Sequence, residues 1–279
     1  MLQMTSLSVF TLNCWGIGFG VSKDRVTRFR AIGQFLAGSN FDLVCLQEVW
    51  CPSDFKTIIE FTKTCLPYNH FFNHGIIGSG TCILSKAAIV DATFHEFSLN
   101  GYPHKIFHGD WFAGKGLGVC AIDFKGFNIH VFVSHLHAEY SRSKDIYLGH
   151  RVMQALEAAQ WIKLTSSGAD LTLYVGDFNF GPEDVPYALL RSVAGLQDSW
   201  EEANGAGGGQ TCGTHYNTYT SNNELCECPS GKRIDYVMFK CGSGRNVSVP
   251  ECVLPLPRRI PGYEVSSSRN VEISSLASS

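Results

Sequence analysis

An apolar stretch, Leu171-Thr172-Leu173-Tyr174-Val175-Gly176-Asp177-Phe178-Asn179-Phe180-Gly181-Pro182, ends abruptly in polar residues. Its β-branched and aromatic residues predict a buried strand, and the Gly-Pro pair closes the loop after it. Asp177 and Asn179 lie two residues apart, so they point to the same side if the strand geometry continues, with Phe178 turned away. On these residues alone, an Asx-type turn and a functional carboxylate with an amide are both open interpretations.

Three other predicted strands end on a polar residue, and a fourth carries an internal acid. We expect these strands over Leu7–Leu12, Phe41–Gln47, Phe127–Ser134 and Lys232–Phe239. The polar residues are, in the same order, Asn13, Glu48, His135 and Asp235. An acid between apolar neighbours is costly to bury unless it is paired, so Asp235 is expected to have a partner, ideally a histidine. Several strands that end on polar residues predict one shared site.

Between these strands, apolar residues recur at the spacing typical of helices. Helices are expected from Ser22 to Gly38, from Ser53 or Asp54 to about Thr64, from Ser143 or Asp145 to about Thr165, and over Val185–Val193. Further strands are expected over Thr81–Ser85 and Val90–Leu99, and a polar loop over Ala203–Cys228.

Composition describes a single globular domain. The 279 residues have no linker or internal repeat, and a net charge of −3 argues against a nucleic-acid-binding protein. The 11 cysteines are scattered and mostly lie in apolar runs, which favours core packing in a reducing compartment. Neither a signal peptide nor a stretch of about 18 apolar residues is visible, so we expect a soluble or peripheral protein.

The segment His108–Gly118 gathers glycines around Lys115. Because Gly116 follows the lysine, the segment departs from the nucleotide P-loop pattern. It is interpreted either as a hairpin or as a mobile loop that presents Lys115 to a phosphate, with Asp110 holding the ammonium when substrate is absent. His137 would share a face with His135 if the strand continued.

Five motifs, in order, resemble the endonuclease/exonuclease/phosphatase superfamily. They are Leu12–Gly16, Leu46–Trp50, Ser134–Tyr140, Gly176–Asn179 and Arg233–Tyr236. Within this superfamily the chain is similar to neutral sphingomyelinases of the sphingomyelin phosphodiesterase 2 type. The resemblance to that branch is carried by His135–Tyr140, Asn100–Pro103 and His108–Gly118, and it covers roughly residues 6–266.

The resemblance implies an α/β (α+β) fold like that of deoxyribonuclease: a four-layer sandwich of two mainly antiparallel sheets flanked by helices. The implied reaction is Mg²⁺-dependent hydrolysis of sphingomyelin, or a related choline phospholipid, to a lipid alcohol and phosphocholine. Its implied place is the cytosolic face of intracellular membranes. Alternatives are a lysophospholipase C, an inositol-lipid phosphatase or a nuclease of the same superfamily, and a non-catalytic lipid-binding isoform.

The same resemblance implies roles for the polar residues. Glu48 would bind the metal with Asn13 close by. His135 would donate to a non-bridging phosphate oxygen, Asp177 and Asn179 would orient the attacking water and the phosphate, and Asp235 would orient a general-base histidine. Substrate binding would involve Lys115, Asp110 and His137.

The end of the sequence departs from this family pattern. The family carries a Ser-Asp-His segment on a late strand, whereas residues 261–266 are followed here by Ser267-Ser268-Arg269-Asn270. We therefore expect a catalytic domain over residues 1–266 that lacks its last strand or strands, and a divergent Ser-rich tail over 267–279 without core periodicity. The branch's paired transmembrane helices are also absent from the sequence. Loss of a general base typically costs about 10²–10⁴ in rate, so we expect impaired turnover.

Overall fold

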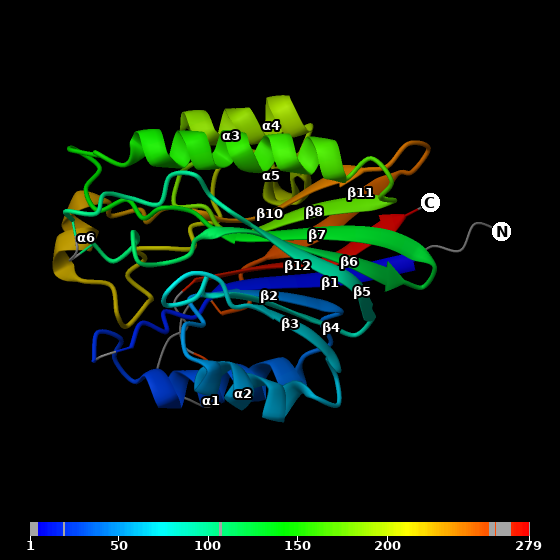
Figure 1. Cartoon of the computed structure of the whole chain (residues 1–279), viewed down its shortest axis with the longest axis horizontal. Coiled ribbons are helices and arrows are strands. Elements are labelled where there is room, and N and C mark those ends of the chain that lie inside the picture. The colour runs from blue at the N-terminus through cyan, green and yellow to red at the C-terminus, as the bar shows by residue number, and fades with distance from the viewer. Residues whose placement is uncertain (1–4, 19, 106–107, 257–259, 261–268, 279) are drawn as a thin grey trace.

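The computed structural model describes residues 5–18, 20–105, 108–256, 260 and 269–278. Two six-stranded sheets pack face to face, with helices on their outer faces (Figure 1). This arrangement confirms the predicted four-layer sandwich. Among the described helices, none combines the length and the apolar character needed to cross a lipid bilayer.

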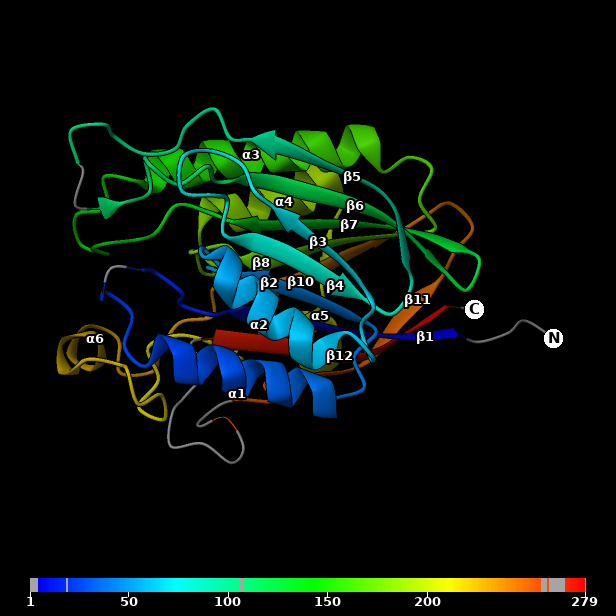
Figure 2. The same cartoon turned by 60° about the horizontal axis from the view of Figure 1, so that its bottom comes forward.

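The first sheet is built mainly from the two ends of the chain. Its strands are β1 (Thr5–Asn13), β2 (Leu43–Gln47), β3 (Tyr68–Phe72), β4 (Thr81–Ser85), β11 (Val247–Val253) and β12 (Arg269–Ser278). They lie in the order β11-β12-β1-β2-β4-β3. Only β1 and β2 pair in parallel, and α1 (Arg25–Gly38) connects them. Figure 2 shows α1 beside α2 (Pro52–Thr62) across the outer face of this sheet.

The second sheet repeats this plan. Its strands are β5 (Ala88–Glu96), β6 (Gly116–Phe124), β7 (Phe127–His135), β8 (Leu171–Asp177), β9 (Gln197–Asp198) and β10 (Asp235–Cys241). They lie in the order β5-β6-β7-β8-β10-β9. Its one parallel pair, β7 and β8, is connected by α3 (Leu148–Thr165), which packs beside α4 (Val185–Ala194). The helices α5 (Ser199–Asn204) and α6 (Asn222–Glu227) are short.

Period-two alternation divides each central strand between two hydrophobic cores. In β1, Val9 packs between the two sheets while Phe10 and Leu12 pack beneath α1. A third core lies between the second sheet and α3 with α4. Because both faces of these strands are covered, their sequences are apolar throughout rather than alternating with polar residues.

Buried cysteines belong to these cores, as predicted. Cys45 and Cys120 are fully buried between the sheets. Burial raises the pKa of the Cys120 thiol to about 12, so this thiol packs as a small apolar group.

Helix starts differ from the predicted positions for local reasons. The helix expected from Ser143 or Asp145 begins at Leu148, because the Asp145 carboxylate accepts a hydrogen bond from the Tyr147 N–H at 3.1 Å and pairs with Arg151. The loop expected over Ala203–Cys228 contains α6, which begins with a capping box between Ser221 and Glu224.

Strand β12 corrects the expectation for the Ser-rich end of the sequence. Residues 269–278 pair antiparallel with β1 on one side and with β11 on the other. Without this strand, the edge of β1 away from β2 would present unpaired N–H and C=O groups. Residues 269–278 therefore form a strand although their sequence has no core periodicity, since backbone pairing outweighs the polar composition.

Replacing Ile273 by proline tests this strand. Ile273 pairs with Val9 and with Cys252, so proline removes a backbone donor from a strand that has partners on both sides. We expect Ile273→Pro to lower the free energy of unfolding by about 1–3 kcal/mol in urea titrations. Ile273→Val keeps the N–H and serves as the control. Equal stability of the two variants would show that β12 contributes nothing to the fold.

Candidate active site

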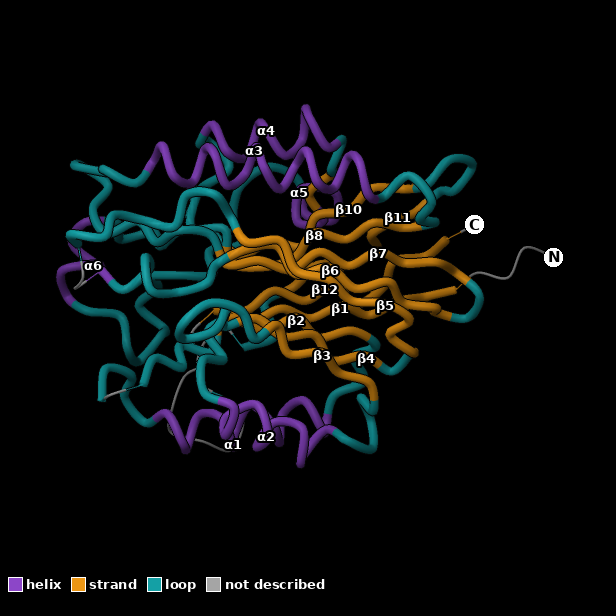
Figure 3. Tube along the Cα trace, in the orientation of Figure 1, coloured by secondary structure: helices purple, strands orange, loops and turns teal. Residues whose placement is uncertain are grey.

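The two parallel strand pairs place their carboxyl ends at one end of the molecule. Loops gather at this end, opposite the two chain termini (Figure 3). Asn13 and His135 are the last residues of β1 and β7, Asp177 is the last residue of β8, and Glu48 directly follows β2. The predicted convergence of strand ends on one place is thus present.

Asn13 joins the two sheets at this end. Its side-chain Nδ2 donates to Glu48 Oε1 at 2.8 Å and to Asp177 Oδ2 at 2.8 Å. Its Oδ1 accepts from the Trp15 N–H at 2.8 Å, which fixes which way the amide faces. Asn13 and Asp177 are buried, and Glu48 is half-buried. One amide therefore holds two carboxylates from different sheets at a fixed separation.

Strand register brings three polar residues side by side in the second sheet. Asp177 of β8 pairs with His135 of β7 on one side and with Asp235 of β10 on the other. His135 Nε2 lies 3.8 Å from Asp177 Oδ2. The buried Asp235 carboxylate accepts from Thr211 Oγ1 at 2.6 Å, so a hydroxyl is one partner of this acid.

The turn after β8 has the Asx-type geometry that was one interpretation of the Gly-Asp-Phe-Asn stretch. Asp177 Oδ1 accepts from the Asn179 N–H at 3.1 Å, and Asn179 has a φ of 52°. This is an Asx-type turn, so the strand geometry does not continue as the shared-face argument assumed. The Asn179 amide donates to the Leu136 carbonyl at 3.0 Å, and Phe178 is buried against Tyr174 as expected.

Lys115 and Asp110 form the predicted ion pair, but inside the protein. Both residues are buried, and the ammonium also donates to the Leu136 carbonyl at 2.9 Å and lies 3.4 Å from His135 Nε2. A Cβ added to Gly114 would lie 2.4 Å from the His74 carbonyl oxygen. The glycines here allow close backbone packing, and the segment is a loop that leads into β6 and not a hairpin.

His137 does not share a face with His135, because β7 ends at His135. The imidazole of His137 stacks on Tyr147 with the ring centroids 3.9 Å apart, and its Nδ1 lies 3.9 Å from Asp110 Oδ2. It is fully buried. His137 therefore lies against the Asp110 carboxylate and is not placed beside Asp177.

Burial and neighbouring charges set the protonation states of His137 and Asp110. Burial lowers the pKa of His137 to about 4, outweighing the opposing effect of Asp110. Burial alone would raise the pKa of Asp110, but Lys115, His137 and the Tyr140 hydroxyl hold it well below its usual value. At neutral pH the structure therefore contains a neutral imidazole beside an ionised carboxylate.

Sequence reasoning missed Arg28. Its fully buried guanidinium donates to the carbonyls of Cys14, Trp15 and Lys23, and it lies 5.0 Å from the Trp15 ring. Trp15 has a φ of 45°, so Arg28 holds the strained turn that follows Asn13. An arginine four residues before Ile32 on the apolar stripe of the helix is the signal that could have revealed it.

A cavity of about 470 Å³ opens beside Asn179. Its walls are the segments 179–183, 207–213 and 224–234, together with Glu139 and Arg142. The Glu139 carboxylate accepts from Lys232 Nζ at 2.7 Å and from Arg142 at 3.0 Å. The candidate site therefore continues into a cavity of mixed polar and apolar lining that is large enough for a small organic group.

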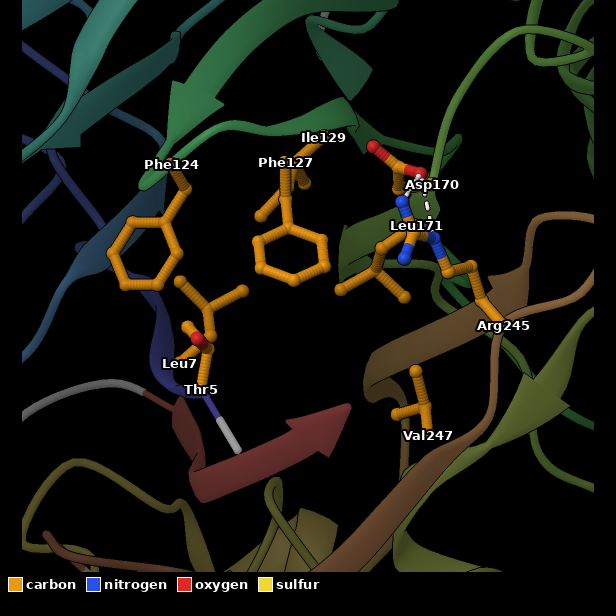
Figure 4. Close-up of a pocket in the computed structure, with 9 residues that line it drawn as sticks. All are labelled: Thr5, Leu7, Phe124, Phe127, Ile129, Asp170, Leu171, Arg245 and Val247. Carbon is orange, nitrogen blue, oxygen red and sulfur yellow. Dashed lines mark hydrogen bonds and ion pairs between the residues drawn. The ribbon is translucent and has the colours of Figure 1, made fainter. Parts of the chain in front are cut away.

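A second cavity lies at the opposite end of the strands, between Leu7, Ile129 and the Asp170–Arg245 ion pair (Figure 4). Its volume of about 30 Å³ admits about one water molecule. Most of its lining is apolar, and it contains none of the residues predicted for the site. It is a packing gap between the two sheets.

Comparison with known proteins agrees with this geometry. The model of the Endonuclease/Exonuclease/phosphatase family matches residues 10–252. The chain belongs to this family. It is 46% identical over 244 residues to human sphingomyelin phosphodiesterase 2, an alignment that covers 87% of this chain and 57% of the relative. The chain thus spans little more than half the length of that relative.

Solved structures show the same fold. TDP2 from C. elegans superposes with a TM-score of 0.71 at 21% identity, covering 98% of this chain and 74% of that one. A beta toxin variant from Staphylococcus aureus with bound magnesium ions has a TM-score of 0.68 at 18% identity, covering 98% and 99% of the two chains.

The donor set at the candidate site suits a hard cation. Carboxylate oxygens of Glu48 and Asp177 flank the Asn13 amide, and Mg²⁺ prefers one or two carboxylates with retained waters over a cage made only of protein ligands. In the described part of the chain, no three His, Cys, Asp or Glu side chains are grouped closely enough to hold a metal by themselves. The residues therefore fit a partly hydrated Mg²⁺ and not a structural zinc site.

Substitution of Arg28 tests how the turn after Asn13 is held. Arg28→Met leaves three carbonyl oxygens without their donor, and we expect the free energy of unfolding to fall by about 3 kcal/mol. Arg28→Lys keeps one donor and the charge, so it should lose less. Urea titration measures both variants, and an unchanged stability of Arg28→Met would show that the guanidinium does not hold the turn.

The depressed pKa of His137 predicts acid sensitivity. The unfolded chain takes up a proton near pH 6.5 while the folded His137 stays neutral to about pH 4, so stability is lost as the pH falls through this window. The loss reaches about 2 kcal/mol at pH 5. In thermal unfolding from pH 7 to 5, His137→Phe should show a flatter dependence than the wild type, and the exposed control His104→Phe should not. Parallel curves for all three proteins would contradict the assignment.

Proposed function

We propose that this chain contains the site of a Mg²⁺-dependent phosphodiesterase that hydrolyses sphingomyelin to ceramide and phosphocholine. The observation that carries the proposal is the Asn13 amide held between the Glu48 and Asp177 carboxylates, with His135 beside Asp177. The similarity to a relative named sphingomyelin phosphodiesterase 2 supports the choice of substrate. The magnesium ions bound by a beta toxin variant with the same fold support the choice of metal.

Glu48 is the proposed metal ligand, and Asn13 positions it. A bound Mg²⁺ would polarise the phosphodiester. The Asn13 amide keeps the Asp177 carboxylate apart from Glu48, which leaves Asp177 to accept a proton from an attacking water or to orient it. Hard oxygen ligands at the junction of the two sheets are consistent with this division of roles.

The phosphate would lie against His135, Asn179 and Lys115. His135 is proposed to donate to a non-bridging oxygen as negative charge grows there. Lys115 Nζ lies 3.4 Å from His135 Nε2, so the lysine adds positive charge to the same place while Asp110 orients it. His137 is proposed to act through Asp110, because the two residues are in contact and His137 is buried away from Asp177.

The cavity beside Asn179 is the proposed place of the head group. Its volume of about 470 Å³ exceeds what a choline group needs, and its walls are rich in glycine and charged side chains. A cavity whose walls carry several charged side chains suits a head group better than the two hydrocarbon chains of ceramide. We propose that the chains remain in a membrane on the cytosolic side, where the relatives' type is expected to act.

Turnover is proposed to be weak because the general-base histidine of the family pattern is missing. Residues 216–279 contain no histidine, and Asp235, the residue expected to orient it, accepts from Thr211. Residues 1–266 remain the proposed catalytic domain, with the qualification that β12 completes its first sheet. The same absence favours one second candidate, a non-catalytic lipid-binding protein.

Release of phosphocholine from sphingomyelin, with Mg²⁺ or with EDTA, tests the proposal. We expect slow release that EDTA abolishes and that Asp177→Asn lowers by about 10² or more. Ser267→Asp combined with Ser268→His restores a Ser-Asp-His segment directly before β12 and should raise the rate by about 10²–10⁴. Ser267→Asn combined with Ser268→Gln is the matched control.

Two results would count against this account. Release unaffected by EDTA would remove the metal from the proposal. A wild-type rate equal to that of the Ser-Asp-His variant would show that the missing histidine does not limit turnover, and lipid binding without any release in either protein would favour the second candidate.

A further inference from the structure

Large apolar side chains are exposed unevenly over the described surface. Seventeen are exposed, and ten of these lie in the loops at the end of the molecule that holds the candidate site. Nine come from loops flanking the site, and six of these form what we call the apolar rim: Ile17, Val21, Ile76, Ile77, Trp111 and Ile146. Single exposed apolar residues are ordinary, but their concentration at one end of the molecule calls for a partner.

The rim residues belong to loops that leave the sheets in the same direction. Residues 14–24 follow β1, residues 73–80 precede β4, residues 97–115 precede β6, and residues 136–147 follow β7. In Figures 1 and 3 these loops extend from the end of the sheets opposite the two termini. The rim is therefore a discontinuous set of loop residues at the end of the molecule that holds the candidate site.

The most exposed part of the rim is held firmly. Ile76 is 81% exposed, yet the neighbouring Gly75 packs so closely on Gly114 that an added Cβ would lie 2.7 Å from the Gly114 Cα. The Gly114 N–H also donates to the Gly78 carbonyl at 3.2 Å. The loop thus presents two adjacent isoleucines to the surroundings while its base is fixed to the segment that carries Asp110 and Lys115.

The charges of these loops nearly cancel. Lys and Arg residues number five and Asp and Glu residues number four across the segments 14–24, 73–80, 97–115 and 136–147. Lys115 is paired with Asp110, and Arg142 bonds to Glu139 and Asp184. Attraction to anionic lipid needs a cluster of about four to eight unpaired basic side chains, which these loops do not have.

We propose that the apolar rim docks this end of the molecule onto a zwitterionic lipid bilayer. Isoleucine and tryptophan on separate loop tips suit the boundary between head groups and acyl chains, where each inserts a few ångströms. A surface that binds a folded protein partner would instead be contiguous and complementary in shape to that partner. The inference rests on the proposed function in one respect: a lipid substrate must enter the site from such a surface.

Vesicle sedimentation tests the docking without any need for turnover. Vesicles of phosphatidylcholine and sphingomyelin should bind the wild-type chain, equally at about 0.1 and about 0.5 M salt. Ile76→Ser combined with Ile77→Ser should weaken this binding about tenfold or more, because two inserted side chains are lost. Leu164→Ser is the matched control, since Leu164 is 78% exposed on α3 outside the rim, and its binding should change by less than about twofold.

Several outcomes would overturn the proposal: no binding to these vesicles, equal binding by the rim variant and the wild type, equal loss in the control, or binding that requires anionic lipid and disappears at high salt. Concentration-dependent self-association that the rim substitutions abolish, without vesicle binding, would identify the rim as a contact between copies of the chain.

Hydrolysis of a short-chain sphingomyelin dissolved as monomers separates this inference from the proposed function. The rim variant should cleave it at the wild-type rate, because a soluble substrate needs no docking. Vesicle binding by the rim without cleavage of either substrate would refute the proposed function alone. Cleavage of the soluble substrate without vesicle binding would refute the docking surface alone.

Discussion

The site depends on one side-chain amide. Asn13 ends a strand of the first sheet, and its Nδ2 bonds to the Glu48 carboxylate of the same sheet and to the Asp177 carboxylate of the other. Two half-buried or buried carboxylates of like charge would repel each other, and the shared donor offsets this repulsion. Because the amide is fixed by the Trp15 N–H and the turn by Arg28, the junction of the sheets is built before any substrate binds.

The topology explains why the polar residues meet there. Each sheet contains a single parallel pair, β1 with β2 and β7 with β8, each bridged by a helix on the outer face. A parallel pair places both carboxyl ends at the same edge, and ligands bind at such ends in α/β proteins. When the two sheets stack, the edges face each other, so residues far apart in sequence become neighbours.

Much of this could be predicted from sequence. The apolar runs are long because every central strand is buried on both faces, and an abrupt change to a polar residue therefore marks a strand end reliably. Asn13, Glu48, His135 and Asp177 were found in this way. The shared face of Asp177 and Asn179 was inferred from a continued strand, but a turn with positive φ at Asn179 follows β8 instead.

What sequence reasoning missed depends on contacts between distant segments. His137 was paired with His135 by strand periodicity, but a strand's end is set by its hydrogen-bonding partners, and β7 stops at His135. Arg28 carries no local signal other than a charge on an apolar stripe. The Ser-rich end has no core periodicity, yet the edge of β1 provides backbone partners that no local composition reveals.

The position of β12 shows where the general-base histidine of the family pattern falls in the sequence relative to the site. Its first residue, Arg269, pairs with Asn13, so the segment where the family pattern carries Ser-Asp-His leads into the strand at the site end of β1. A histidine placed there would enter next to the residue that joins the two carboxylates. The chain therefore retains the framework of the site while one chemical group of the family pattern is absent.

The most direct test of the account is a crystal structure of the chain grown with Mn²⁺ in place of Mg²⁺, examined by anomalous scattering. We predict one strong peak bound to the Glu48 carboxylate, which disappears in Glu48→Gln. A peak away from Glu48, or no peak at saturating Mn²⁺ with Glu48 and Asp177 still joined by Asn13, would contradict the claim that the junction of the two sheets is a metal site.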